Sequence, residues 1–253
     1  AEKGERTRGA ARLKFLWEDI LVPLARAMHA GVGAAVAELR PDVVVVDQQA
    51  LAGALVARTG NLPWATFATT SAALADPLAE WPKVKQWHGE LLRDLQREAG
   101  LAPVDVPDCS PRLVVVFSTD VLVGPLSGFP AHYQFVGPSI HARAEHAPFP
   151  WDQLRAEPRV LVSLGTVNAE AGATFYPRVL EAFSGQNLQI ILVAPAGTVA
   201  EPPGNFIVSS FVPQLALLPH VHAVVSHAGH NTVAETLAHG LPLVVAPIKD
   251  DQH

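Results

Sequence analysis

The amino-acid sequence predicts an α/β protein that is built on parallel sheets and divided into two domains. Short runs of β-branched apolar residues, such as 43–46 and 223–226, alternate with longer segments of helical periodicity. Glycine and polar residues follow several of these runs, where the loops of an open parallel sheet bind ligands. The chain has 253 residues, of which 49% are hydrophobic, so it can bury two cores. We therefore expect two doubly wound parallel sheets.

Composition and charge argue against several classes of protein. A net charge of -6 and the lack of a basic cluster argue against a nucleic-acid partner. The single cysteine, Cys109, cannot form an internal disulfide and fits a reducing compartment, so we expect a cytoplasmic protein. No apolar run approaches the roughly 20 residues that span a bilayer, which leaves at most a peripheral membrane contact.

The first domain is expected to span 1–138 and to begin with a long helix. Apolar residues recur with helical spacing between Leu13 and Leu39, and Pro23 should kink or divide that helix. A domain of this class should open with a strand, and the chain begins without an initiator methionine. We therefore expect a fragment whose two domains are both incomplete.

Asp47 is the candidate functional residue of the first domain. Residues 42–47 are predicted to form a buried strand that ends in this carboxylate, followed by a helix over 50–59 and a strand over 62–67. A carboxylate at the carboxyl end of a buried strand faces the ligand crevice. Alternatively, Asp47 only ends the strand or caps the next helix.

The rest of the first domain carries less chemistry. A helix over 81–100 has an apolar stripe rich in tryptophan, which either lines a ligand pocket or forms core. Short strands are expected at 113–117 and 133–136. A stretch rich in proline and histidine, 139–158, has no apolar period and is expected to link the domains.

The second domain is expected to span 159–253. Its first strand runs into the sequence Ser-Leu-Gly-Thr, in which a glycine and the hydroxyls of Ser163 and Thr166 suit phosphate oxygens. A tight turn is the alternative. The next helix and strands are expected at 174–183, 188–193 and 205–209.

The densest cluster of polar residues lies near the end of the chain, between two predicted strands. The elements there are a strand, a helix and a second strand, at 223–226, 230–239 and 243–246. Gly229 allows the backbone to approach a ligand, and the helix start offers N–H groups to an anion. His227, Asn231 and Thr232 add side-chain donors. We expect a phosphate or diphosphate here.

Structural roles are the alternatives for the same residues. Thr232 and Glu235 form the pattern of a capping box, and Asn231 could be the N-cap of the helix. A histidine at a strand end, such as His227, is often structural. The density of polar groups favours a ligand site.

Residues 211–252 resemble the donor-binding signature of the nucleotide-sugar-dependent glycosyltransferases of the GT-B fold. That signature reads W-x-P-Q, L-x-x-H, H-x-G-x-N-[ST]-x-x-E, G-x-P and P-x-x-x-D-Q. It is met here, in order, at 211–214, 217–220, 227–235, 240–242 and 247–252. Phe211 departs from the usual tryptophan, and His230 departs from a large aromatic. The S-x-G-T at 163–166 also occurs in the family, and the type resembled is the bacterial natural-product one.

The resemblance implies two Rossmann-like domains facing a cleft, with acceptor in the first and donor in the second. It implies that Phe211 stacks on the nucleotide base, that Gln214 lies near the base and ribose, and that Glu235 accepts hydrogen bonds from ribose hydroxyls. It places Val212 in the same donor site. The implied diphosphate ligands are Ser163, Thr166, His227, Gly229, His230, Asn231 and Thr232. Asp251 and Gln252 match the pair that binds the donor sugar.

The resemblance also implies a reaction. An inverting transferase that needs no metal or other cofactor would move a sugar from a UDP- or TDP-sugar to a hydroxyl of a small lipophilic acceptor, such as a natural product. Asp47 matches the aspartate that orients a catalytic histidine, and we expect that histidine in a segment absent from this chain. A homodimer is left open.

Three alternatives belong to other classes. A nucleotide-sugar epimerase or isomerase of related fold would turn over the donor without an acceptor. A catalytically silent domain would bind nucleotide and transfer nothing. A metal-binding module would use four histidines, namely His220, His222, His227 and His230.

Overall fold

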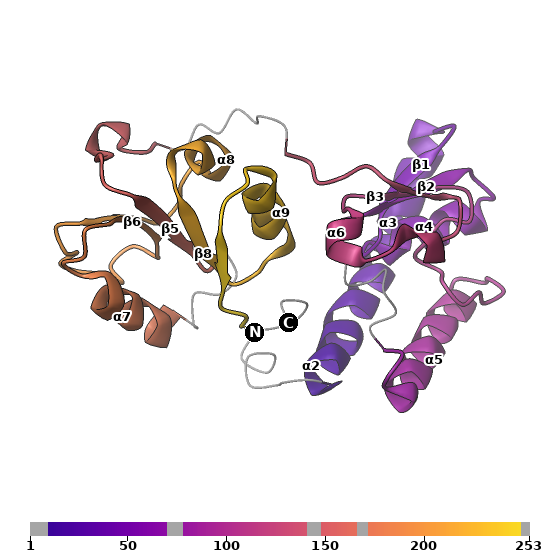
Figure 1. The fold of residues 1–253 in the computed structure, drawn as a ribbon. Helices are drawn as coiled ribbons and strands as arrows, with labels where there is room; N and C mark the ends of the chain where they lie inside the picture. Colours follow the sequence, from indigo (N-terminus) through magenta and orange to yellow (C-terminus); the bar gives the residue numbers. More distant parts are fainter. Residues whose placement is uncertain (1–9, 70–77, 141–147, 166–171, 249–253) are drawn as a thin grey trace. The chain divides into compact units, whose positions relative to one another are not determined.

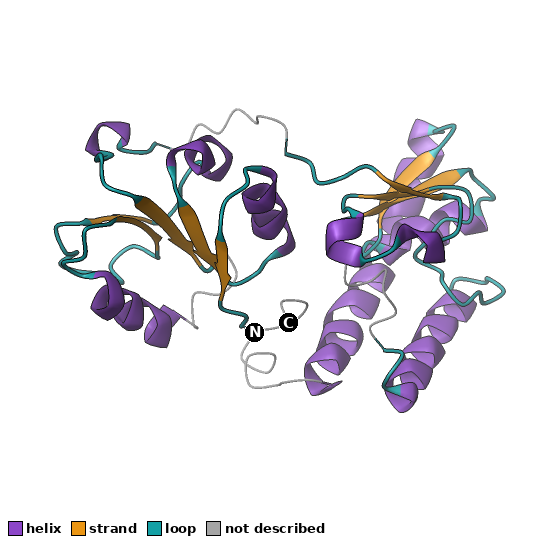
Figure 2. Ribbon diagram, viewed as in Figure 1, coloured by secondary structure: helices purple, strands orange, loops and turns teal. Residues whose placement is uncertain are grey.

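The protein divides into two compact units, each with one all-parallel sheet and helices packed on it (Figures 1 and 2). The units span Ala1–Gly137 and Pro138–His253. The structure is a computed structural model that describes residues 10–69, 78–140, 148–165 and 172–248. The predicted α/β class with parallel sheets is confirmed.

The first sheet has four strands in the order β1-β2-β3-β4. These strands are β1 Val44–Asp47, β2 Trp64–Ala68, β3 Val114–Val116 and β4 Tyr133–Phe135. The helical segments between them are α4 Leu51–Thr59, α5 Pro82–Glu98, α6 Asp120–Val123 and η2 Leu126–Gly128. Strands and major helices lie close to their predicted ranges, because runs of valine and helical apolar periods define them locally.

The long N-terminal helix passes Pro23 without ending. Its parts are α2 Ala10–Lys14, the π-helical η1 Phe15–Leu21 and α3 Val22–Leu39. Pro23 lies in the first turn of α3, directly after the π-helical segment. In a π-helical segment each N–H bonds to the carbonyl five residues earlier instead of four. This change of pairing allows the helix to continue through proline, which has no N–H to donate. The predicted disturbance at Pro23 is thus a local change of helix type.

One face of α3 packs on α4 and α5. The buried cluster between these helices consists of Val22, Ala25, Leu51, Leu55, Leu92 and Leu95. Arg26 of α3 also donates two hydrogen bonds, both of 2.7 Å, to the carboxylate of Glu98 at the end of α5. The C-terminal half of α5, which carries Leu92 and Leu95, therefore forms core. This was one of the two roles predicted for the helix.

The stretch Ala11–Leu39 is nonetheless long and apolar enough, by length and composition, to cross a membrane. The expectation that no segment is so apolar is wrong. Only 17% of its most apolar window is buried, and exposed side chains include Ile20, Leu24 and Leu39. The helix therefore presents one packed face and one exposed apolar face.

The second sheet has five strands in the order β7-β6-β5-β8-β9. They are β5 Arg159–Ser163, β6 Gln189–Val193, β7 Phe206–Ser209, β8 Ala223–Ser226 and β9 Leu243–Val245. The helical segments are η3 Trp151–Gln153, α7 Gly172–Phe183, α8 Gln214–Leu217, η5 Leu218–His220 and α9 His230–Ala238. The chain builds outward from β5 to β7 and then returns to add β8 on the other side of β5.

This return creates a topological switch point between β5 and β8. Val160, Leu161, Val162 and Ser163 of β5 pair in register with the four residues of β8, so that Ser163 lies beside Ser226. The loops that follow these two strands leave the same edge of the sheet. Ligands of open α/β sheets bind at such a crevice, beyond the carboxyl ends of the strands.

Both faces of the second sheet are covered, as a doubly wound fold requires. On β5, Leu161 points into a cluster with Leu217 and Leu218 of the α8–η5 segment. The alternate residues Val160 and Val162 point into a second cluster that includes α7. Phe149, within the range predicted as a linker, also packs in the first cluster.

Candidate functional site

The loop after β8 turns sharply into α9, and no side chain of the described residues caps the start of that helix. Ala228 adopts a left-handed backbone with a φ of 69°, which is uncommon for a residue other than glycine. Gly229 is the N-cap, with φ of -60° and ψ of 136°. Because Gly229 has no side chain, it cannot cap the first turn of α9, and a helix start of this kind suits an anion.

The imidazole of His227 lies between two glycines that belong to different loops. A Cβ atom built on Gly165, after β5, would lie 2.6 Å from Cε1 of His227. A Cβ atom built on Gly229 would lie 2.5 Å from Nε2 of the same ring. Ser226 Oγ is 3.4 Å from His227 Nδ1. The packing therefore holds the ring beside the switch point.

Ser163 shapes the loop after β5 from a buried position. Its side chain is 7% exposed, and its Oγ accepts a hydrogen bond of 3.2 Å from the N–H of Gly165. Gly165 has a φ of 71°, a conformation that favours glycine. The predicted tight turn is therefore present, at the carboxyl end where phosphate binding was also predicted. Thr166 lies outside the described residues.

Gln214 and Glu235 are joined directly, which the sequence did not reveal. Gln214 Nε2 donates to Glu235 Oε2 at 2.6 Å and lies 3.5 Å from Thr232 Oγ1. Glu235 is 5% exposed and lies in the second turn of α9, since that helix begins at His230. A side-chain hydrogen bond thus connects α8 to α9.

The two capping alternatives are wrong. A capping box needs Thr232 as the N-cap, so that the helix would begin at residue 233, and an Asn231 cap would begin it at Thr232. The observed N-cap is Gly229, so Asn231 and Thr232 lie within the helix. Asn231 is exposed at the first turn, where its amide remains a candidate donor.

The residues predicted to bind the nucleotide base differ in exposure. Phe211 is 54% exposed, and Ser209 Oγ donates to its carbonyl oxygen at 2.6 Å, which fixes the backbone below the ring. Val212 is 6% exposed and packs in the core with Leu217. The side chain of Val212 is therefore buried in the core, and only its main chain is left for a ligand.

Asp47 is exposed at the carboxyl end of β1 in the first unit. Its Oδ1 accepts a hydrogen bond from the N–H of Gln49 at 2.9 Å, and its Oδ2 accepts one from Thr69 Oγ1 at 2.9 Å. The N-cap of α4 is Ala50, so the helix-capping role proposed for Asp47 is wrong. Carboxylate oxygens have several lone pairs, and Asp47 keeps acceptor capacity for another donor.

The predicted metal-binding histidines do not converge. Within the described ranges, no group of three or more His, Cys, Asp or Glu residues is arranged to hold a metal ion. The Nδ1 of His222 lies 3.1 Å from the N–H of Arg159, and the ring of His220 packs edge-on against Trp151 at 5.4 Å. The four-histidine alternative is therefore wrong.

Some predicted site residues are not described by the structure, and some contacts in the structure were not predicted from the sequence. Asp251 and Gln252 lie outside the described residues. Thr69 and Ser226 were not predicted as site residues, yet each contacts one that was, and Gly165 of the predicted Ser-Leu-Gly-Thr turn packs against His227. The contact of Gly165 with His227 arises because β5 pairs with β8, which brings the loops after both strands to one edge of the sheet.

Known proteins carry the same sequence features and fold. Residues 159–253 match the sequence profile of the family described as "UDP-glucoronosyl and UDP-glucosyl transferase". Demethyllactenocin mycarosyltransferase of Streptomyces fradiae is 33% identical over 233 residues, covering 84% of this chain and 50% of that protein. The "Uncharacterized UDP-glucosyltransferase YdhE" of Bacillus subtilis is 32% identical over 170 residues, or 64% of this chain and 43% of that protein.

A solved structure agrees with this sequence similarity. The glycotransferase of kitacinnamycin matches with a TM-score of 0.73 at 26% identity, over 92% of this chain and 65% of that chain. The two parallel sheets and the switch point between β5 and β8 are those of the GT-B fold class. The chain is similar in sequence to family 1 glycosyltransferases, among them demethyllactenocin mycarosyltransferase and 4'-demethylrebeccamycin synthase. It spans about half the length of the curated relatives it matches.

Proposed function

We propose that the protein transfers a sugar from a UDP- or TDP-sugar to a hydroxyl group of a small lipophilic natural product. The main observation behind the proposal is that the loop after β5 and the loop after β8 lie against each other at the switch point. There His227, the turn after Ser163 and the open start of α9 gather at one sheet edge. Hydrogen-bond donors and a helix start at a strand end suit a diphosphate.

Transfer requires the departing diphosphate to be stabilised as its charge develops. In our proposal, His227 and the first turn of α9, including His230, Asn231 and Thr232, do this by donating hydrogen bonds to the diphosphate oxygens. The pairing of Gln214 with Glu235 places a buried carboxylate near the start of that helix. We propose that this carboxylate accepts hydrogen bonds from ribose hydroxyls, while the exposed ring of Phe211 stacks on the base.

Transfer also requires a base that takes the proton of the acceptor hydroxyl. We propose a histidine for this step, with Asp47 as the residue that orients it. The hydrogen bonds from Gln49 and Thr69 fix the Asp47 carboxylate, which is what an orienting residue needs. The hydroxyl oxygen would form its bond to the anomeric carbon as the bond to the diphosphate breaks, and this single displacement inverts that carbon.

We further propose that no metal ion or other cofactor takes part and that the reaction occurs in the cytoplasm. The helix start and the neutral donors supply the stabilisation that a divalent cation gives in other phosphate sites. The natural-product acceptor is proposed from the printed names of relatives such as demethyllactenocin mycarosyltransferase and 4'-demethylrebeccamycin synthase.

Calorimetric titration with UDP and with TDP, each with and without EDTA, tests the donor site. We expect saturable binding of at least one nucleotide, with the same affinity in EDTA. Asn231→Ala should weaken it by about tenfold, which corresponds to one lost charge-assisted hydrogen bond. Exposed Asn61, in the other unit, provides the control Asn61→Ala. A folded protein that binds neither nucleotide would refute the proposed site.

A further inference from the structure

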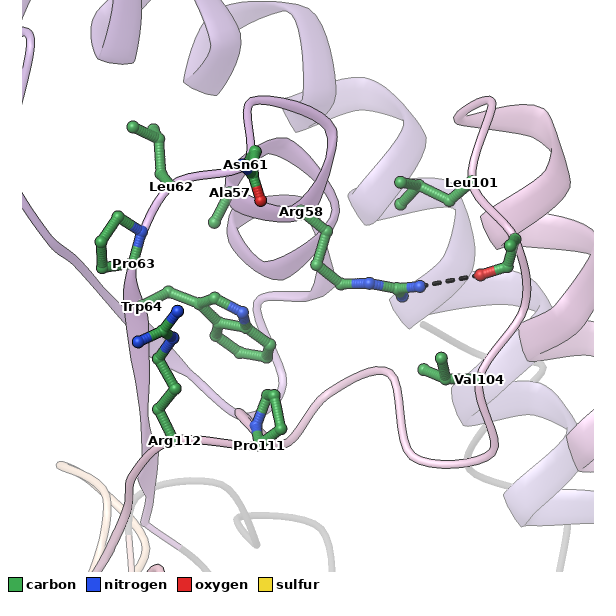
Figure 3. A pocket seen from close by; sticks show the side chains of 11 residues that line it. Ala57, Arg58, Asn61, Leu62, Pro63, Trp64, Leu101, Val104, Pro111 and Arg112 are labelled. Carbon is green, nitrogen blue, oxygen red and sulfur yellow. Dashed lines mark hydrogen bonds between the residues drawn. The ribbon is translucent and has the colours of Figure 1, made fainter.

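The amino ends of β2 and β3 in the first unit carry two arginines without an acidic neighbour in their pocket. Arg58 lies in the last turn of α4, and Arg112 precedes β3. The residues between and around them line an open pocket of about 540 Å³ (Figure 3). This volume is in the range of small-molecule sites. Asp47 and Thr69 lie at the opposite edge of the sheet, at the carboxyl ends of β1 and β2, so this pocket is separate from the candidate site.

Arg58 is half-buried, and within the described part of the chain its guanidinium is bonded only to neutral acceptors. Its Nη1 donates to Oε1 of Gln96 at 2.8 Å, and its Nη2 donates to the carbonyl oxygen of Ala102 at 2.9 Å. Burial lowers the pKa of Arg58 from its ordinary value. The guanidinium still carries its charge at neutral pH, because arginine does not lose its proton in proteins. A partly desolvated cation without a counter-ion favours an anion.

Arg112 adds a second positive charge, which is exposed. Among the described residues its guanidinium has no hydrogen-bond or ion-pair partner, and only its main chain is bonded, to Ser110 Oγ at 3.2 Å. No aspartate or glutamate is among the residues that line the cavity. The pocket is thus locally cationic on a chain whose net charge is -6.

The end of α4 would repel an anion, but weakly. Its macrodipole places roughly half a negative charge at the carboxyl terminus. The carbonyls of Val56 and Ala57 there are bonded to the N–H groups of Gly60 and Leu62. Two guanidinium charges therefore exceed the opposing partial charge.

Part of the wall of the pocket is apolar and is held in place before any ligand arrives. Trp64, Leu101 and Val104 supply apolar surface. Gln96, which is 0% exposed, fixes the 101–104 segment because its Oε1 accepts from the N–H of Val104 and its Nε2 donates to the Val104 carbonyl. Figure 3 shows Arg58 crossing from α4 to this segment. A preformed site loses less conformational entropy when it binds.

We propose that this pocket binds a small organic carboxylate with an apolar or aromatic body. The carboxylate would take hydrogen bonds from Arg112, since the planar guanidinium matches a carboxylate, while Arg58, on the other side of Trp64, would add a second positive charge. The apolar body would lie against Leu101, Val104 and the edge of Trp64. This site does not depend on the proposed transferase reaction.

Calorimetry with 1-naphthoate as probe, and with 1-naphthalenemethanol as its neutral counterpart, tests the proposal. We expect saturable binding of the naphthoate and at least tenfold weaker binding of the alcohol. Saturating UDP should leave the naphthoate affinity unchanged, because the donor site lies in the other unit.

Variants of Arg112 locate the site. Arg112→Gln should weaken naphthoate binding about tenfold, Arg112→Lys should recover part of it, and Arg178→Gln, an exposed arginine of α7, should have no effect. The urea midpoint of each variant should match that of the parent, since the Arg112 side chain has no partner to lose. Equal binding of acid and alcohol, an unchanged affinity in Arg112→Gln, or no binding of the naphthoate would overturn the proposal.

Discussion

The side-chain amide of Gln214 donates a hydrogen bond of 2.6 Å to the carboxylate of Glu235, which joins the start of α8 to the second turn of α9. Glu235 is nearly buried, so water replaces this donor poorly. The bond fixes the position of α9 relative to the segment that carries Phe211. It therefore couples the two halves of the proposed nucleotide site.

Removing the amide of Gln214 should reduce stability. Gln214→Leu should lower the free energy of unfolding by about 1–3 kcal/mol, because a buried carboxylate loses a donor. Urea unfolding followed by circular dichroism measures the change. Gln86 makes a comparable bond of 2.9 Å to Glu90, but on an exposed surface. Gln86→Leu should cost less than about 0.5 kcal/mol. Equal losses in the two variants would contradict the role of burial.

A methyl group at Gly229 should displace the His227 ring. The φ of Gly229 is -60°, which alanine adopts without strain, so the effect of Gly229→Ala is steric. We expect affinity for the nucleoside diphosphate to fall about tenfold. Gly204→Ala is the matched control, since nothing lies within 4 Å of a Cβ atom there. Combining Gly229→Ala with His227→Ala should cause no loss beyond that of His227→Ala alone, and additive losses would exclude this mechanism.

Asp47 should affect transfer more than donor binding. In the full-length protein, Asp47→Asn should lower kcat roughly 100-fold or more, because an amide cannot stabilise a protonated histidine. Thr69→Val should have a smaller effect in the same direction, since it removes the bond that fixes Oδ2. Both variants should leave the Kd of the donor nucleotide unchanged in calorimetry. A weaker Kd in Asp47→Asn would make this residue structural.

Cys109 should make stability depend on pH in the alkaline range. Burial, followed by the nearby charge of Asp108, raises the pKa of this thiol from 9.0 to about 12. The folded state therefore holds the proton more tightly than the unfolded state. Its contribution is complete below pH 9 and is lost as the pH rises toward 12. Relative to Cys109→Ala, the parent should lose stability across this window in urea titrations, and parallel curves would disprove the effect.

Local sequence was sufficient to predict most elements. The valine-rich run 223–226 was predicted as a strand and is β8, and the helix predicted to begin at His230 does so. Glycine and alternating apolar residues set these limits without help from distant parts of the chain. Pro23 was the exception, because a π-helical segment absorbed it.

Contacts between distant residues could not be predicted. The T-x-x-E pattern of Thr232 and Glu235 is a local capping signal, yet Glu235 pairs with Gln214 of another helix. The order of strands depends on the crossover that places β8 beside β5, and no short pattern encodes it. Burial of the Val212 side chain depends likewise on the packing of α8, and the family position of this residue does not reveal it.

The close packing of Gly165 and Gly229 against the His227 ring also limits which substitutions this sequence can accept over evolutionary time. Gly165 and Gly229 each approach the ring too closely to accept a β-carbon. A larger residue at either position would have to be accompanied by a smaller one at 227. In an alignment of related chains, these three columns should therefore covary, although 165 and 227 are far apart along the chain.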